Sequence, residues 1–99
     1  MTSDKADRLA AVRVKFIASV KERVQELTVC LAEEHWIDEW QSLQAKVHKI
    51  AGSAGFYGEH DVACLAAAID RKLQVEPNTD AIEDLRAEIS ALIETIQAL

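Results

Sequence analysis

Apolar residues recur every three or four positions along this chain, in four stretches separated by short polar breaks. This spacing predicts amphipathic α-helices, because residues three and four apart lie on one side of a helix with 3.6 residues per turn. We expect a first helix from residue 3 or 4 to 33 and a second from 35–38 to 56 or 57. A third is expected over 61–74, and a fourth from the Asn78–Thr79 cap to the end of the chain.

The apolar stripes define the expected core. The longest consists of Leu9, Val12, Phe16, Val20, Val24, Leu27 and Leu31. The second keeps an unbroken spacing of four and three residues through Trp36, Trp40, Leu43, Val47, Ile50 and Ala54. Four such stripes joined by short turns predict an all-α fold, an antiparallel up-down four-helix bundle that forms one domain over residues 1–99. The first helix is long for a globular protein, which leaves a break near its start open.

Charge and hydropathy narrow the functional classes. The net charge is −6, and no basic stripe with interleaved aromatic residues is present, so nucleic acid is not an expected partner. No apolar run approaches 18 residues, which argues against a membrane span. The first residues lack the apolar core of a secretion signal, so a cytoplasmic protein is expected. A monomer is the default expectation for its oligomeric state.

The cysteines and histidines do not form a metal-binding pattern. Cys30 and Cys64 lack CxxC spacing, and we interpret them as small buried thiols. A metal-binding bundle would use a Glu-x-x-His pair, but Ala45 stands three positions before His48. No metal site is therefore predicted.

His48 is the most informative residue. It lies about 100° around the second helix from Val47, beside the apolar stripe and towards solvent. Ala51 and Gly52 follow it by one turn and Gly55 by two. A glycine inside a helix costs roughly 1 kcal/mol relative to alanine. Two glycines near one exposed imidazole indicate a site that another molecule approaches closely, although close packing between helices is the competing explanation.

A neutral imidazole is a good nucleophile near pH 7, because its ordinary pKa is about 6.5. Transfer of a phosphoryl group to it needs an in-line approach and electrostatic stabilisation of the phosphoryl oxygens. Gln44, one turn before His48, is placed to donate a hydrogen bond. Lys46 and Lys49 can reach such a group only from the side, and Ser53 is expected to bond within its own helix or to a neighbouring one.

The stretch from His48 to Gly58 resembles the signature of the histidine-containing phosphotransfer (Hpt) domain family. In that family the phosphorylatable histidine is followed four residues later by a glycine, then by small residues and by a hydrophobic–glycine pair. This chain has Gly52, Ser53 and Ala54, and then Tyr57–Gly58, at those places. The order of helices also matches, so the resemblance covers nearly the whole chain.

The resemblance implies a phosphocarrier that accepts a phosphoryl group on His48 from an aspartate of a response-regulator receiver domain and passes it to another receiver. A hybrid histidine kinase is a further implied partner. Mg²⁺ is expected in the receiver and no cofactor in this chain, whose sequence has no glycine-rich phosphate loop for ATP. The docking surface is expected beside His48 on the first and second helices, with Val14 as a candidate.

One departure from the family pattern keeps alternatives open. Many members carry a lysine three residues after the histidine, where this chain has Ala51, and Lys49 is the candidate substitute. A helical interaction module that is never phosphorylated therefore remains an alternative. Another is the phosphoacceptor domain of a chemotaxis-type histidine kinase. A stand-alone carrier is the expectation, because the chain ends directly after its fourth helix.

Overall fold

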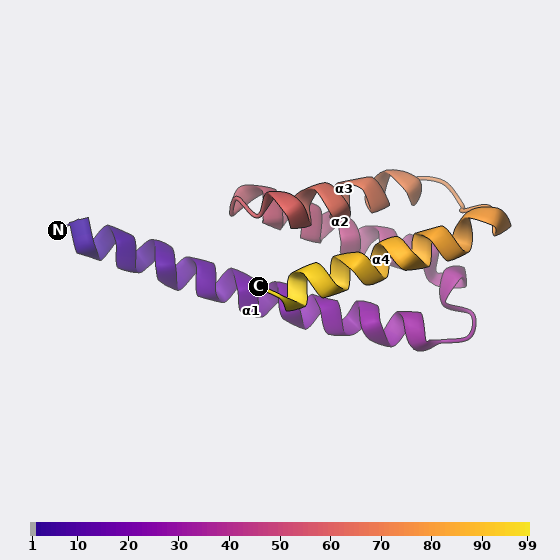
Figure 1. The fold of residues 1–99 in the computed structure, drawn as a ribbon, viewed down its shortest axis with the longest axis horizontal. Helices are drawn as coiled ribbons and strands as arrows, with labels where there is room; N and C mark the ends of the chain where they lie inside the picture. Colours follow the sequence, from indigo (N-terminus) through magenta and orange to yellow (C-terminus); the bar gives the residue numbers. More distant parts are fainter. Residues whose placement is uncertain (1) are drawn as a thin grey trace.

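The computed structural model describes residues 2–99, with side chains from residue 7 onward, and this part of the chain is helical throughout without strands. The elements are α1 (Thr2–Ala32), the 3₁₀ turn η1 (Trp36–Glu39), α2 (Trp40–Phe56), α3 (His60–Lys72), the 3₁₀ turn η2 (Thr79–Ala81) and α4 (Ile82–Gln97). Consecutive helices run in opposite directions (Figure 1). The all-α up-down bundle predicted from the stripes is confirmed.

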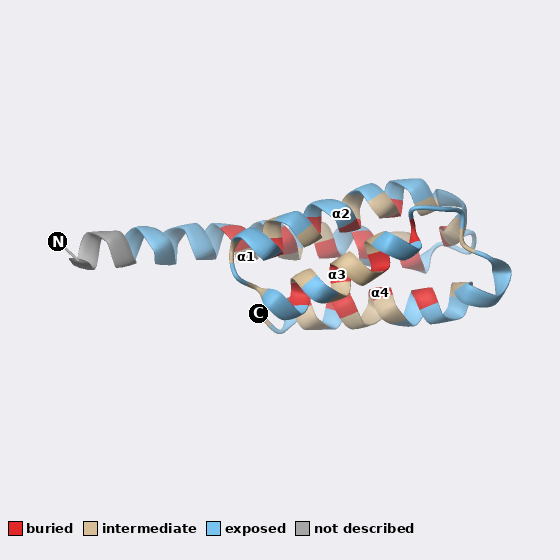
Figure 2. Cartoon of the chain, turned by 90° about the horizontal axis from the view of Figure 1, so that it is seen from above, coloured by how far each residue is buried: buried red, intermediate tan, exposed pale blue. Residues whose placement is uncertain are grey.

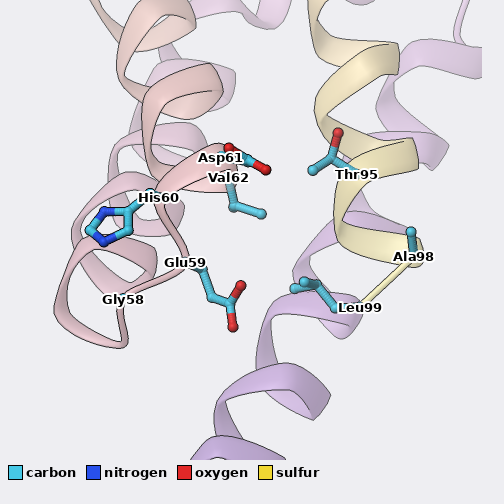
Figure 3. A pocket seen from close by; sticks show the side chains of 8 residues that line it. All are labelled: Gly58, Glu59, His60, Asp61, Val62, Thr95, Ala98 and Leu99. Atoms are coloured by element: carbon cyan, nitrogen blue, oxygen red, sulfur yellow. The ribbon is translucent and has the colours of Figure 1, made fainter.

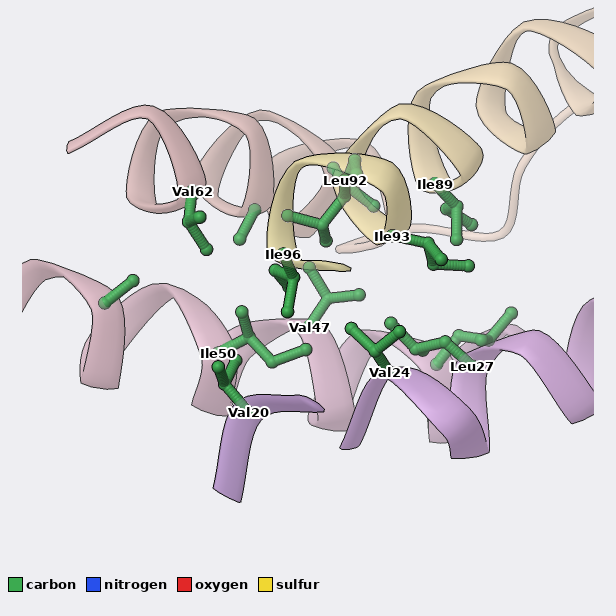
Figure 4. Close-up of a cluster of buried hydrophobic side chains, with 14 of the residues drawn as sticks. Val20, Val24, Leu27, Val47, Ile50, Val62, Ile89, Leu92, Ile93 and Ile96 are labelled. Atoms are coloured by element: carbon green, nitrogen blue, oxygen red, sulfur yellow. The ribbon is translucent and has the colours of Figure 1, made fainter. Parts of the chain in front are cut away.

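One apolar core lies between the four helices. Its most deeply buried side chains come from every helix, with Leu27, Leu43, Ile69 and Leu92 each at most 1% exposed. Figure 4 shows the valines and isoleucines of α1 and α2 facing those of α3 and α4. Each fully buried aliphatic side chain contributes about 1.5–3 kcal/mol relative to an exposed one. Burial of the four stripes therefore holds the helices together.

The loops at the η1 end are joined to the bundle by Arg86 of α4. Its guanidinium donates a hydrogen bond to the carbonyl oxygen of Leu31 at 2.9 Å, which satisfies one of the carbonyls left free at the end of α1. The same guanidinium lies 5.9 Å from the ring centre of Trp36. Arg86 thus connects the end of α1, the η1 turn and α4.

The start of the second segment differs from the prediction. Trp36 is buried but belongs to η1, and the regular helix that carries His48 begins only at Trp40, which is half-buried. Neither Asn78 nor Thr79 caps the fourth helix through its side chain, because η2 separates Asn78 from α4. In both places a 3₁₀ turn replaces the first turn of the expected α-helix.

The first half of α1 extends beyond the bundle as a single unbroken helix (Figures 1 and 2). The break left open near its start is absent from Thr2 to Ala32. Leu9 and Val12 were expected in the core but are 64% and 42% exposed, because α2, α3 and α4 end before reaching them. Val14 is also exposed. The molecule is consequently elongated, 56 Å by 22 Å by 19 Å.

The expectation of two buried thiols was wrong. Cys64 is exposed and Cys30 is half-buried, and both are free. Burial nevertheless raises the pKa of the Cys30 thiol, with smaller effects from Lys46, which lowers it, and from the carboxylates of Glu39 and Glu33, which raise it. Cys64 lies on the outer side of α3, where Val62, Ala66 and Ile69 occupy the inner side.

Candidate functional site

Helix α2 holds His48 at the surface because its neighbours on the other side are buried. Val47 and Ile50 are fully buried, which fixes the rotation of the helix. The imidazole, about 100° further around, is 69% exposed. The sequence prediction of an outward-facing histidine is confirmed by this exposure.

The imidazole is not free to rotate, because Asp70 of α3 holds one of its nitrogens. The distance from His48 Nδ1 to Asp70 Oδ2 is 2.8 Å. An ionised carboxylate can only accept a hydrogen bond, so a neutral ring must carry its proton on Nδ1. In this tautomer, which follows from the hydrogen-bonding partners, Nε2 keeps its lone pair.

Three side chains keep Asp70 ionised and in place. The hydrogen bond from His48 is the largest cause that lowers its pKa below the ordinary carboxyl value, and partial desolvation opposes it. The amides of Gln44 and Gln74 both donate to Oδ1, at 2.6 and 3.0 Å. The carboxylate thus accepts Gln44 and Gln74 on one oxygen and His48 on the other.

The α2–α3 hairpin explains how residues distant in sequence meet here. Gly58, with φ of 76°, turns the chain between the two helices in a left-handed conformation that suits glycine. In an antiparallel hairpin centred on residue 59, position 48 faces position 70 and position 44 faces position 74. The His48–Asp70 contact follows this register. The amides of Gln44 and Gln74, which the register also places opposite each other, both donate to the same carboxylate.

The glycines near His48 are not explained by packing within the chain. Gly52 and Gly55 are both exposed, and a Cβ atom built on either would meet nothing within 4 Å beyond its chain neighbours and the backbone of its own helix. Alanine would fit at both positions and would favour the helix by roughly 1 kcal/mol each. The close-packing explanation is therefore excluded in this structure, and the glycines leave an open shelf beside the imidazole.

The remaining predicted site residues divide between two sides of α2. Positions 46 and 53 lie about 140–160° around the helix from His48, and the Lys46 ammonium donates to the Ser42 hydroxyl at 3.3 Å. Lys49 is exposed, about 100° from His48. Ala51 is half-buried and packs against the core. None of these four residues joins the hydrogen-bonded group around His48. Among the predicted supporting residues, the structure brings only Gln44 into that group.

Helix α1 contacts the opposite flank of α2. The ring of Tyr57 stacks on Phe16 of α1, with centroids 4.6 Å apart, and position 57 lies about 180° around from position 48. The immediate surroundings of His48 are therefore formed by α2 and α3, and the expectation that the docking surface extends to α1 stays a prediction. Phe56, about two turns beyond His48, is the one exposed large apolar side chain of α2, at 81% exposure.

Sequence reasoning missed Asp70 and Gln74. Both lie on the polar side of the third predicted helix, where carboxylates and amides are common and do not by themselves indicate a functional site. The hairpin register was the signal that could have found them, because a hairpin centred on residue 59, directly after the turn at Gly58, places residue 70 opposite residue 48.

Among the described side chains, residues 7–99, no three His, Cys, Asp or Glu gather as they would around a metal ion. No helix within residues 2–99 combines the length and the apolar character needed to cross a bilayer.

Comparison with family models matches residues 11–98 to the Hpt domain. No match was found among curated proteins or among solved structures. The family match spans all four helices and includes both His48 and Asp70.

Proposed function

Because the chain belongs to the Hpt domain family, whose members carry out histidine phosphotransfer in phosphorelays, we propose that His48 is its phosphoacceptor and that Nε2 is the reacting atom. The observation that carries this proposal is the contact between Nδ1 and Asp70. It leaves an unprotonated nitrogen on an exposed ring whose orientation is held by the protein.

The transfer step balances without a further reactant. The lone pair of Nε2 attacks the phosphorus of an aspartyl phosphate on a receiver domain, a P–N bond forms, and the P–O bond to the aspartate breaks. The electron pair of that bond leaves on the receiver's carboxylate. The proton on Nδ1 stays in place, and the reverse sequence passes the phosphoryl group to a second receiver.

Asp70 acts in this scheme as a positioning residue. It selects the tautomer in which Nε2 is nucleophilic and offsets the positive charge that the ring gains when Nε2 bonds to phosphorus. Gln44 and Gln74 hold the carboxylate for that purpose, so we assign Gln44 to the support of Asp70. Its predicted hydrogen bond to the phosphoryl group would require the amide to leave Oδ1.

The open shelf suits a partner whose reacting aspartate lies in a recessed pocket. The loops around such a pocket must pass close to α2, and the absence of side chains at Gly52 and Gly55 gives them room. Phe56 offers an exposed aromatic anchor at the edge of the same surface. The Mg²⁺ that supports transfer belongs in this proposal to the receiver.

The absence of a lysine at position 51 is the reason for considering alternative functions. Ala51 supplies no cation for the phosphoryl group, so this carrier depends on Lys49 or on the partner for that charge. A module that binds partners without phosphorylation would need no held tautomer, whereas this chain uses three side chains to hold one. The phosphoacceptor domain of a kinase would use the same His48 chemistry with a kinase as the donor.

The test is phosphorylation of the purified chain with a panel of phosphorylated receiver domains and, separately, with histidine kinases and ATP. We expect a label on this chain that is lost in acid and stable in base, as a phosphoramidate requires, and that maps to His48. The variant His48→Gln should fold normally, with a change in the free energy of unfolding below about 0.5 kcal/mol, and should accept no phosphate.

The chain offers matched controls in its two other histidines. His35→Gln and His60→Gln remove exposed imidazoles that lie outside the hydrogen-bonded group, and both variants should be labelled like the parent. Label that persists in His48→Gln, or a parent that no donor phosphorylates, would refute the proposal. Labelling by a kinase but by no receiver would favour the kinase-domain alternative.

A further inference from the structure

The part of α1 before Phe16, residues 2–15, projects beyond the bundle as a helical arm (Figure 1), and residues 7–15 are all exposed. At 1.5 Å per residue its length is about 21 Å. Leu9 and Val12 continue the apolar stripe that Phe16 and Val20 carry into the core, yet both are exposed. An isolated helix of this length is marginal in water, and most helices gain their stability by packing such a stripe against a partner.

The charge of the arm is opposite to that of the bundle. Residues 1–15 contain four basic and two acidic side chains, a net charge of +2, and because the whole chain carries −6 the remaining residues carry −8. Arg8, Arg13 and Lys15 supply three of the four positive charges. The arm therefore fits an acidic surface of the kind that this chain itself presents.

An acidic hollow lies at the root of the arm. A cavity of about 600 Å³ between the start of α3 and the end of α4 is lined by the carboxylates of Glu59 and Asp61 and by apolar atoms of Val62 and Leu99 (Figure 3). Within one chain, Arg13 of the arm pairs with Glu59 at 2.7 Å. Asp61 is exposed at the same end of the bundle.

We propose that this surface binds a second copy of the chain, in a two-fold symmetric dimer whose two arms pack antiparallel to each other. In this arrangement Leu9 and Val12 of the two copies face one another, and the tip of each arm reaches the end of the other bundle. Arg8 then meets Asp61 of the second copy at the acidic hollow. An interface of this kind repeats each contact twice, as two-fold symmetry requires.

The dimer leaves the phosphotransfer site open. The arm belongs to α1, which contacts the flank of α2 opposite His48, and it lies beyond the end of the bundle. A receiver can therefore dock on α2 and α3 of either copy. Stable interfaces bury about 1,200–2,000 Å² in total, and two short arms with their contacts to the bundles fall near the lower limit, so we expect dissociation in the micromolar range.

The test is sedimentation of the full chain over a range of micromolar concentrations. We expect a concentration-dependent shift from monomer to dimer mass, and a dissociation constant raised about tenfold or more in the double variant Leu9→Glu/Val12→Glu. Both side chains are exposed and glutamate is a good helix former, so this variant keeps its fold. The control is Val14→Glu, which places one glutamate about 140° around the helix from Leu9 and should dimerise normally.

A charge exchange tests the register. Arg8→Glu should weaken the dimer, Asp61→Arg should weaken it as well, and the two together should restore it. A chain that stays monomeric at all concentrations, or a dimer that Leu9→Glu/Val12→Glu does not weaken, overturns the proposal. Labelling of His48 measured on the same variants keeps this result separate from the phosphotransfer function, because both the monomer and the dimer should be labelled.

Discussion

Replacing Asp70 by asparagine tests the chemical core of the site. The substitution keeps the size and shape of the side chain but removes the charge and adds an amide group that can donate. An asparagine amide can donate to Nδ1 of His48, which would move the ring proton to Nε2 and block the attacking lone pair. Even with the carbonyl oxygen facing Nδ1, the charge that stabilises the phosphorylated ring is lost.

The expected magnitude follows from the exposure of the pair. A hydrogen bond to a charged group contributes about 1.5–3 kcal/mol when buried, and exposed ion pairs contribute about 0–1 kcal/mol. The carboxylate of Asp70 is only 14% exposed but the imidazole is 69% exposed, so an intermediate value applies. A loss of about 1–2 kcal/mol of transition-state stabilisation slows phosphoryl acceptance by roughly 5- to 30-fold.

The assay is the rate at which a phosphorylated receiver labels His48 in the parent and in Asp70→Asn. Asp84→Asn is the matched control, because it removes an exposed carboxylate from α4 and should leave the rate unchanged. Nitrogen NMR of the imidazole provides a second measurement that a purely structural role would not affect. The parent should show the proton on Nδ1, and the variant should show the Nε2 tautomer in increased proportion.

Two results would refute this reasoning. One is a labelling rate in Asp70→Asn equal to that of the parent, which would show that the carboxylate does not assist Nε2. The other is an unchanged tautomer, which would mean that something other than Asp70 sets the position of the ring proton. A slower rate accompanied by loss of folding would be recognised from the circular dichroism of the variant.

Three further predictions concern the shelf, the carboxylate and the thiols. Gly52→Ala should raise the free energy of unfolding by about 1 kcal/mol in denaturant titrations, whereas Gly52→Leu should keep the fold and slow transfer from a receiver about tenfold or more if its clash costs 1.4 kcal/mol; transfer at the parental rate would disprove the role of the shelf. Because the pKa of Asp70 is lower in the folded state than its ordinary value near 3.9, its contribution to stability is complete above that value and is lost as the pH falls through the folded-state pKa. Unfolding measured across this acid range should therefore show a smaller acid-induced loss in Asp70→Asn than in the parent, and equal losses would contradict the assignment. Iodoacetamide should modify Cys64 before Cys30 at neutral pH, since Cys64 is exposed while burial raises the pKa of the Cys30 thiol. Mass spectrometry of the digested protein measures the order, and modification of Cys30 first would contradict this prediction.

The helices were predictable because their signal is local. Burial of Leu43, Val47, Ile50 and Ala54 follows directly from a spacing of three and four residues. The exposure of His48 follows from its position about 100° around the helix from Val47, away from that stripe. The same rule failed at Leu9 and Val12. The period shows which side of a helix is apolar, but it does not show where the neighbouring helices end.

The candidate site was only half predictable. The imidazole and the two glycines belong to one helix, so periodicity and composition find them together. Asp70 and Gln74 reach His48 from another helix, and their role depends on the register of the α2–α3 hairpin, which the turn at Gly58 sets. Whether the glycines served packing or access also depended on what surrounds them in three dimensions.

The sequence by itself therefore determined the bundle and the exposed imidazole of His48, because helical periodicity and the chemistry of a side chain are properties of short stretches. Only the tertiary structure decided which nitrogen of His48 is free and which helices surround it. It also decided that Leu9 and Val12 of the apolar stripe on α1 are not buried by any other helix that the structure describes. These features depend on distances between residues far apart in sequence, and those distances arise when the four stripes pack together.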